Sequence, residues 1–423
     1  MDNNPFSKLA KRSSIAVEQP HLQGPSRIGE SRFVSTNFQP SAVPENTHST
    51  PRSSSHDSRF PVYGLDWTSS AQSDIAKIAV SSFREDSTNR LKIIKGSPIY
   101  IDDEQNGTKT TDAYEFTSMA EITVNYPITR LQWDPSMPLY PDVTCVATTS
   151  ECLRVYELLE PDPSQSYAQS PRIIEKMTLT NSKTKNFNQL PPLTSFDWNK
   201  TDSRHIITSS IDSTCTLWDI SRGTGVAKTQ LIAHDSEVFD VKFLHGNKHV
   251  FTSCSNDGSI RVFDLRSLEH STIIYEPQST RSSIASIATL SSAQDAAMGQ
   301  RVPLLRLATS NYNANQIAAI EADSNRILIL DLRYPETPIE ILRHHVAPVN
   351  SIAWHPSKNF LLTGADDCQV LIYDLTTCGQ PENSVAPCFG FFDEMEVNNV
   401  CWNTDGSWVA ANSGRRTQAV ALM

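Results

Sequence analysis

The chain has 423 residues, and its 47 Asp and Glu against 36 Lys and Arg give a formal net charge of −11 at pH 7. This balance excludes general nucleic-acid binding, which needs a basic face. No apolar run approaches the roughly 18 residues that a membrane span requires. The first residues, MDNNPFSKLAKRSS, lack the apolar centre of a secretory signal. We therefore expect neither a membrane anchor nor export.

The N-terminal residues 1–57 are rich in Ser, Pro, Asn and Gln and carry almost no alternating apolar pattern. Such a composition buries too little apolar surface to order itself, so we predict a disordered tail there. Residues 58–423 are predicted to form the folded domain. Within that domain, the Ser- and Ala-rich stretch at about 278–301 is expected to be an inserted loop.

Eight cysteines occur singly along the chain, and none forms a C-x-x-C pair. We expect reduced thiols in a protein of the nucleus or cytosol, without a disulfide framework. His345 and His355 could suggest a metal site. The repeat described below accounts for His345, however, and a turn before Pro356 accounts for His355. The sequence therefore predicts no metal site, and no pattern indicates a cofactor.

From Pro61 onward, short runs that alternate apolar and polar residues recur with turn residues between them. This period-2 pattern indicates short antiparallel strands and an all-β fold. The runs fall into seven groups, which begin near Pro61, Ile128, Leu193, Gln230, Leu305, His345 and Val397.

The clearest group runs from Gln230 to Glu276. His234 opens it, and four alternating runs follow. The turn at Asn256-Asp257-Gly258 is a hairpin signal, because Asp and Gly tolerate the positive φ that a tight turn requires. This group is therefore predicted to be one four-stranded sheet.

Three groups share a set of polar residues at fixed spacing. A turn Asp lies four residues after a hydroxyl and six before an aromatic, and a His precedes two of the three copies. The sets are Thr208, Asp212 and Trp218; His234, Ser253, Asp257 and Phe263; and His345, Thr363, Asp367 and Tyr373. Such residues can form a buried hydrogen-bond chain that fixes each turn against the next strand.

A repeat of about 40 residues with a leading His and a trailing Trp-Asp is the signature of WD-repeat proteins. The chain resembles that family in spacing, turn chemistry and alternation. The resemblance implies a seven-bladed WD-repeat β-propeller with a disordered N-terminal extension, each repeat supplying one blade. Tryptophans that end the first run of five groups are then expected to pack in the core: Trp67, Trp133, Trp198, Trp354 and Trp402.

One edge of this predicted ring has no obvious partner, because the chain stops on the third run of the seventh group. A closed ring needs its edge strands paired. One candidate for the missing strand is the polar segment SSSHDSRFP just before Val62. The other is Arg32–Thr36, which is more β-like but would leave a long loop. The sequence leaves both open.

Several local sequences resemble one WD-repeat subfamily, including PLTSFDWN at 192–199, TSSIDSTCTLW at 208–218 and VNNVCW at 397–402. That subfamily contains plant transparent-testa-glabra proteins and a cullin-four-associated adaptor that scaffolds DYRK-type kinases. The resemblance implies a non-enzymatic scaffold of nucleus and cytoplasm, and we expect the chain to be a monomer. It would recruit a DYRK-type kinase and its substrates or transcription regulators. The fifth group departs from the subfamily, which has a Trp near Thr309.

Residues 250–266 also resemble the box found in WD-repeat substrate receptors of cullin-four RING ubiquitin ligases. In that box an Arg after an aromatic-Asp pair contacts the ligase adaptor. The resemblance implies Arg266, with Asp264, as a contact, and Arg333 in a weaker copy. The alternative function is therefore a substrate receptor, although an exposed Arg after a strand is common in any protein.

His234, Ser253 and Asp257 also have the composition of a hydrolase triad. The set recurs at His345, Thr363 and Asp367, and an active site is not duplicated in successive repeats. The hydroxyl also lies within a predicted strand, where no sharp turn exposes it as a nucleophile. We therefore expect structural roles for these residues, no catalytic residue, and no enzymatic activity.

Overall fold

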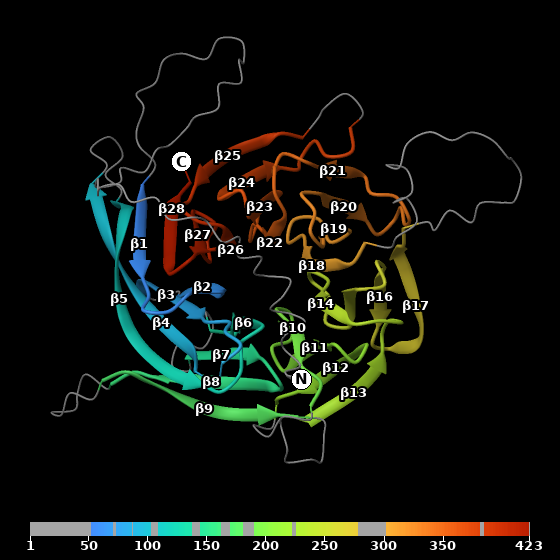
Figure 1. Ribbon diagram of the computed structural model, residues 1–423, viewed down its shortest axis with the longest axis horizontal. Helices are drawn as coiled ribbons and strands as arrows, with labels where there is room; N and C mark the ends of the chain where they lie inside the picture. The colour runs from blue at the N-terminus through green and yellow to red at the C-terminus, as the bar shows by residue number, and fades with distance from the viewer. Residues whose placement is uncertain are drawn as a thin grey trace, which may run out of the picture.

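The computed structural model describes residues 52–70, 73–86, 88–102, 109–137, 144–161, 170–180, 190–221, 226–277, 302–380 and 385–422. These residues form seven four-stranded antiparallel sheets arranged around a central axis (Figure 1). The seven-bladed propeller predicted from the repeats is thus confirmed. The stretch 278–301, expected to be a loop, lies outside the described residues.

Each blade is a meander whose first strand lies nearest the axis. Blade 1 consists of β2 (Gly64–Ser70), β3 (Ser73–Ser81), β4 (Asn89–Asp102) and β5 (Lys109–Val124), and blade 2 of β6 (Arg130–Trp133), β7 (Thr144–Thr149), β8 (Leu153–Leu159) and β9 (Arg172–Leu179). Blade 3 consists of β10 (Leu193–Trp198), β11 (His205–Ser210), β12 (Thr214–Asp219) and β13 (Val226–Ile232), blade 4 of β14 (Val238–Phe243), β15 (Val250–Ser255), β16 (Ile260–Asp264) and β17 (Ser267–Tyr275), and blade 5 of β18 (Leu304–Thr309), β19 (Gln316–Glu321), β20 (Ile327–Asp331) and β21 (Glu340–Leu342). Blade 6 consists of β22 (Val349–Trp354), β23 (Phe360–Ala365), β24 (Gln369–Asp374) and β25 (Pro387–Phe392), and blade 7 of β26 (Val397–Trp402), β27 (Trp408–Ser413), β28 (Arg416–Ala421) and β1 (Ser53–Asp57).

Blade 7 is completed by the N-terminal strand β1, which pairs with β28 from Ser53 opposite Val420 to Asp57 opposite Arg416. The polar segment before Val62 therefore closes the ring, and the alternative at 32–36 lies outside the described residues. The predicted boundary of the tail at residue 57 is wrong, because residues 53–57 belong to the propeller. β1 carries no apolar pattern because it is an outer edge strand, held by backbone pairing and surface contacts.

The apolar core lies between neighbouring blades. Between blades 3 and 4, for example, Ile207, Val241 and Phe251 are fully buried in one cluster. The second strand of most blades is buried along its whole length, as in β11 and β19. Burial of both faces explains why these strands read as nearly continuous apolar runs. The five tryptophans that end inner strands are all buried, as expected.

Two faces of the disc matter for function. We define the start face as the one where the inner strands begin, and the end face as the one where they end. Loops between blades, and turns between second and third strands, lie at the start face. Loops between first and second strands, and between third and fourth strands, lie at the end face. The residues following the inner strands of different blades line one common cavity, which shows that these strands share a direction.

The hairpin of β4 and β5 extends well beyond the other strands of its blade. β4 spans 14 residues and β5 spans 16, against 7 and 9 for β2 and β3. In Figure 1 these two strands form an arm on the left, beside β1. Tyr114 from the arm packs edge-on against Trp67 and Trp408, with ring centroids 5.5 and 5.0 Å apart. The extension therefore covers the junction where the ring closes.

Candidate protein interface

The predicted polar set of blade 4 forms a buried hydrogen-bond chain. His234 Nδ1 lies 3.0 Å from Asp257 Oδ2, and His234 Nε2 lies 2.7 Å from Ser253 Oγ. Burial alone would raise the pKa of Asp257, but hydrogen bonds from His234 and Ser259 outweigh it and hold the pKa well below its usual range. The turn carboxylate is therefore ionised and tied to the strand.

Blade 6 repeats this arrangement. His345 Nδ1 lies 3.0 Å from Asp367 Oδ2, and its Nε2 lies 2.8 Å from Thr363 Oγ1. His345 and Thr363 are buried, as are His234 and Ser253 in blade 4. A nucleophile must be reachable by substrate, so these duplicated and buried sets have the geometry of structural links between turn and strand.

Blade 3 carries a different part of the set. Trp218 Nε1 donates to Thr208 Oγ1 at 3.0 Å, whereas Asp212 bonds only within its own turn, accepting from Thr214 Oγ1 at 2.7 Å. The expected single chain through all these residues does not form, because no His bridges Asp212 to Thr208. In blade 6 the aromatic is Tyr373, whose buried hydroxyl has no partner among the described residues. Blades 4 and 6 thus contain the bonds from His to Asp and to the hydroxyl, and blade 3 contains the bond from Trp to the hydroxyl.

Arg266 and Arg333, the predicted ligase contacts, lie on neighbouring blades at the end face. Arg266 Nε and Nη2 donate to the two carboxylate oxygens of Asp264 at 2.9 and 2.5 Å. Arg333 grips Asp331 in the same way, at 3.0 and 2.6 Å. Their side chains remain 66% and 58% exposed. Each guanidinium is thus held in one orientation while one edge faces solvent.

The same end face holds a third arginine of this kind, which sequence reasoning missed. Arg204, in the loop between β10 and β11, donates to both oxygens of Asp202 at 2.7 Å and is 64% exposed. The shared spacing, an Asp two residues before the Arg, is the signal that would have found it. Two exposed tyrosines, Tyr312 and Tyr334, lie in end-face loops of blade 5. Arg and Tyr are the residue types most enriched at the energetic centres of protein interfaces.

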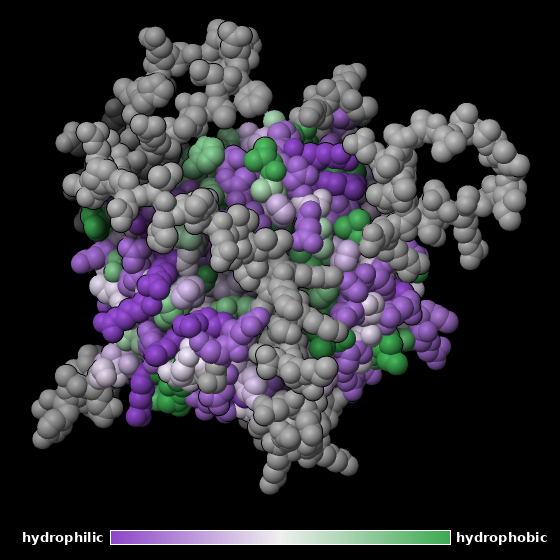
Figure 2. Space-filling model, viewed as in Figure 1, coloured by the Kyte–Doolittle hydropathy of each residue, from purple (hydrophilic) through white to green (hydrophobic). Residues whose placement is uncertain are grey.

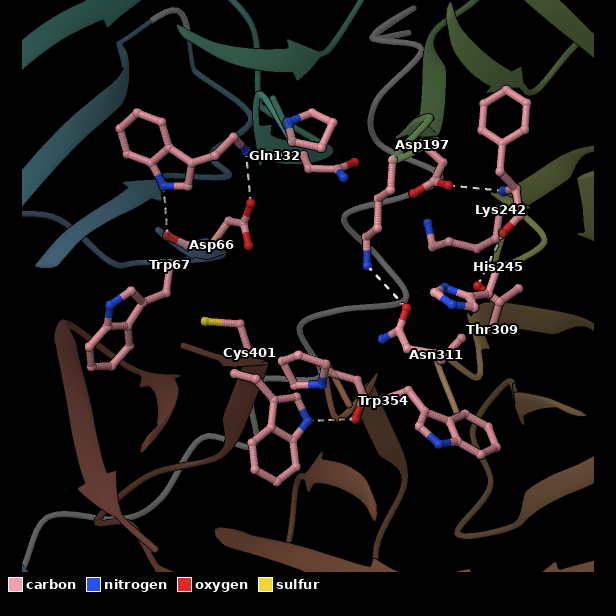
Figure 3. Close-up of a pocket in the computed structure, with 18 of the residues that line it drawn as sticks. Asp66, Trp67, Gln132, Asp197, Lys242, His245, Thr309, Asn311, Trp354 and Cys401 are labelled. Carbon is pink, nitrogen blue, oxygen red and sulfur yellow. Dashed lines mark hydrogen bonds between the residues drawn. The ribbon is translucent and has the colours of Figure 1, made fainter. Parts of the chain in front are cut away.

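The mouth of the central channel opens among these loops as a cavity of about 450 Å³ (Figure 3). Polar side chains of its wall join successive blades. The backbone N–H of Trp133 donates to Asp66 Oδ2 at 2.8 Å, and that of Phe243 donates to Asp197 Oδ2 at 2.9 Å. Burial raises the pKa of Asp66 to about 6. Sequence reasoning missed these links, although each carboxylate directly precedes an inner-strand tryptophan.

Deeper in the channel, Lys242 Nζ contacts Asp240 Oδ1 at 2.9 Å, and both side chains are buried. Burial would raise the pKa of Asp240, but the charges of Lys242, Arg130 and Arg306 outweigh it and lower the pKa to about 2. The charged groups of the channel are therefore balanced against one another, in the manner of a structural ion network.

Within the described ranges, no group of three or more His, Cys, Asp or Glu side chains could hold a metal ion. The same part of the chain contains no helix of the length and hydropathy needed to cross a bilayer. On the face seen in Figure 2, hydrophobic residues form small separate groups among hydrophilic ones.

The fold and the repeat geometry together define a WD-repeat propeller. The family model for the WD domain, G-beta repeat, matches residues 225–264 and 336–374. A Dictyostelium discoideum protein named DDB1- and CUL4-associated factor 7 homolog is 37% identical over 84% of this chain and 94% of its own length. An uncharacterized WD repeat-containing protein of Schizosaccharomyces pombe, C17D11.08, is 38% identical over 77% of this chain and 69% of its own.

The WD repeat-containing protein YPL247C of Saccharomyces cerevisiae is 41% identical over 76% of this chain. The chain spans 58% of the length of that relative. The matches to the Dictyostelium and fission-yeast proteins cover more than two thirds of each partner. This chain therefore belongs to the WD-repeat family that includes the DDB1- and CUL4-associated factor 7 homolog.

Proposed function

We propose that this chain is a non-enzymatic scaffold that holds protein partners on the faces of its propeller. The observation that carries the proposal is the oriented, exposed arginine pair of the end face, Arg266 and Arg333, held by Asp264 and Asp331. A side chain that is already fixed loses little conformational entropy when a partner binds. A second support is that the buried His-Asp-hydroxyl sets are inaccessible to a substrate.

A substrate-receptor role in a cullin-four RING ubiquitin ligase is the second candidate function. The printed name of the Dictyostelium relative associates that protein with DDB1 and CUL4. Arg266 and Asp264 would contact the ligase adaptor, and Arg333 on the adjacent blade would extend the contact. The resemblance of residues 250–266 to the receptor box supports the same assignment.

The scaffold proposal extends to a DYRK-type kinase and its substrates or transcription regulators, and to residence in both nucleus and cytoplasm. The resemblance of residues 192–218 and 397–402 to the kinase-scaffolding subfamily supports this part. Fold alone does not identify a partner. The kinase and the ligase adaptor would have to occupy different surfaces if one chain is to hold both.

Affinity purification followed by mass spectrometry from native cells tests these proposals. Wild type is compared with Arg266→Glu and with Arg204→Glu. Arg204 is a matched control because it is bound by an aspartate in the same bidentate way and is similarly exposed, but lies outside the box. We expect the ligase adaptor to be lost from Arg266→Glu alone and the kinase to remain in all three samples. Retention of the adaptor by Arg266→Glu would overturn the receptor role, and absence of both partners from wild type would overturn the scaffold.

A further inference from the structure

The start face of blade 6 carries exposed apolar side chains that the end-face proposal leaves unexplained. Val346 is 81% exposed, Met395 is 53% exposed and Phe392 is 40% exposed. All three lie in the loops that enter and leave this blade or at the end of its outer strand. Exposed apolar groups that lie next to one another commonly mark a contact surface.

Val346 and Phe392 lie beside one turn, Asp366–Gln369, and Met395 follows in the same loop with its sulfur next to Gly414 of blade 7. The N–H of Val346 donates to Asp367 Oδ2 at 2.9 Å, and the N–H of Asp393 donates to the carbonyl of Cys368 at 2.8 Å. Phe392 is the register partner of Gln369 across β24 and β25. The backbone of the patch is therefore fixed while its apolar side chains face outward.

Carboxylates surround the same turn. Burial, and then the charges of Glu396, Asp367, Asp393 and Asp366, raise the pKa of the Cys368 thiol, which places four acidic groups around one atom. Asp367 is paired with His345. Asp366, Asp393 and Glu396 form no ion pair with a cation in the described part of the chain.

One compensating cation comes from the neighbouring blade. Arg416 Nη1 contacts Glu394 at 3.0 Å and its Nε contacts Asp57 at 3.3 Å, so this cation is already shared between two carboxylates. The turn of blade 6 therefore keeps an excess of negative charge beside exposed apolar groups. An anionic occupant, such as a nucleic acid or an acidic membrane, would be repelled.

We propose that this blade 6 patch, formed by Val346, Phe392, Met395, Asp366, Asp393 and Glu396, binds a linear protein segment in which Lys or Arg alternate with apolar residues. The apolar side chains would cover Val346 and Met395, and the cations would lie against the carboxylates of Asp366 and Glu396, since Oδ2 of Asp393 is buried. The assignment gives the proposed scaffold a second docking surface, opposite the face assigned to the ligase adaptor. It names the chemical class of the partner. The patch and the ligase contact at Arg266 lie on different faces, so either proposal can fail without the other.

The chain offers a built-in reporter for binding. Cys368 is half-buried within the patch, whereas Cys388 is exposed near the other end of the same blade, at the start of β25. Burial raises the pKa of both thiols, so both react slowly and can be compared at one pH. The probe is a short acetylated and amidated peptide in which Arg and Leu alternate. Maleimide labelling of each cysteine is followed by peptide mass spectrometry.

We expect the Arg-Leu peptide to slow labelling of Cys368 and leave Cys388 unchanged. A peptide alternating Glu and Leu should have no effect, and one alternating Arg and Ser should protect less. Glu396→Lys should weaken binding about fivefold or more, because it turns an attraction into a repulsion. Glu269→Lys, the same charge change on exposed β17 of blade 4, is the matched control and should stay within about twofold.

Two results would overturn the proposal. The first is equal weakening by Glu396→Lys and Glu269→Lys, or equal protection of both cysteines, which would mean that only the net charge attracts the peptide. The second concerns residues 1–51, which contain Lys8, Lys11 and Arg12. If their removal speeds labelling of Cys368 without any peptide, the occupant is the chain's own N-terminal segment. Val346→Ser changes an exposed side chain and should leave folding intact. Weaker peptide binding by this variant would therefore report a lost contact.

Discussion

Arg306 Nη2 donates a hydrogen bond to Tyr63 Oη at 2.9 Å, which joins blade 5 to the segment that enters blade 1 on the far side of the ring. Arg306 also donates to the carbonyl of Leu305 at 3.1 Å. A half-buried guanidinium is costly unless its donors are satisfied. This contact therefore spans the channel and stabilises the whole ring, because the two residues belong to blades that are not neighbours.

Removal of the Tyr63 hydroxyl tests that contact. Tyr63→Phe leaves a half-buried cation short of one acceptor, so we expect a loss of about 1–3 kcal/mol of stability. The measurement is chemical denaturation at neutral pH. Tyr312→Phe removes a hydroxyl from an exposed ring and should change stability by less than about 0.5 kcal/mol. Equal effects would show that the contact across the channel contributes nothing.

Ring closure by β1 is a separate prediction. Removal of residues 1–51 keeps β1 and should leave hydrogen exchange of the β28 amides slow. Removal of residues 1–57 also deletes β1, so β28 becomes an open edge and its amides should exchange faster. Hydrogen exchange read by mass spectrometry compares the two truncated chains. Similar slow exchange in both would contradict the assignment of β1 as the closing strand. The contact of Arg416 with Asp57 would be lost only in the shorter chain.

His56 should make stability depend on pH. Its Nε2 lies 2.7 Å from Lys92 Nζ, and burial, followed by the charge of Lys92, lowers the pKa of His56, although a backbone contact at Phe116 and the charge of Asp57 act in the other direction. The unfolded chain therefore binds a proton first as pH falls below about 6.5. Stability should be unaffected above that pH and should fall below it, until the folded form is protonated as well.

The check is the free energy of unfolding between pH 5 and pH 8, for wild type and His56→Gln. The variant should lose less stability than wild type on the acid side. His205, His344 and His355 also have lowered pKa values, chiefly through burial, so some acid sensitivity remains in the variant. Parallel curves for the two proteins would exclude His56 as a contributor.

The buried hydroxyl sets make a prediction about stability alone. Ser253→Ala leaves His234 Nε2 without its partner and should cost about 1–3 kcal/mol. Thr252, the neighbouring residue on β15, has a buried hydroxyl with no partner among the described residues, so Thr252→Val should be near neutral. Chemical denaturation curves of the two variants compare these losses of stability. An equal cost for both changes would mean that packing, and not the hydrogen bond, sets the value.

The blades could be predicted from the sequence because their signals are local. Alternation and turn residues identify strands such as Val238–Phe243 and Val250–Ser255 without knowledge of the rest of the chain. β1 could not be singled out, since an outer edge strand is held by pairing with β28 and not by apolar residues of its own. The site was predicted in part. Arg266 and Arg333 could be found because each belongs to a local Asp-x-Arg motif. The link between Asp66 and Trp133 could not, because it joins residues of two neighbouring blades that are far apart in the sequence.

The measurement that tests the scaffold most directly is a sequential affinity purification, first through the ligase adaptor and then through a tag on this chain. We expect a DYRK-type kinase in the second eluate from wild-type cells and neither adaptor nor kinase there with Arg266→Glu, because the first step would no longer capture the chain. A wild-type eluate that contains the adaptor without any further protein partner would contradict the claim that this propeller gathers partners on separate faces.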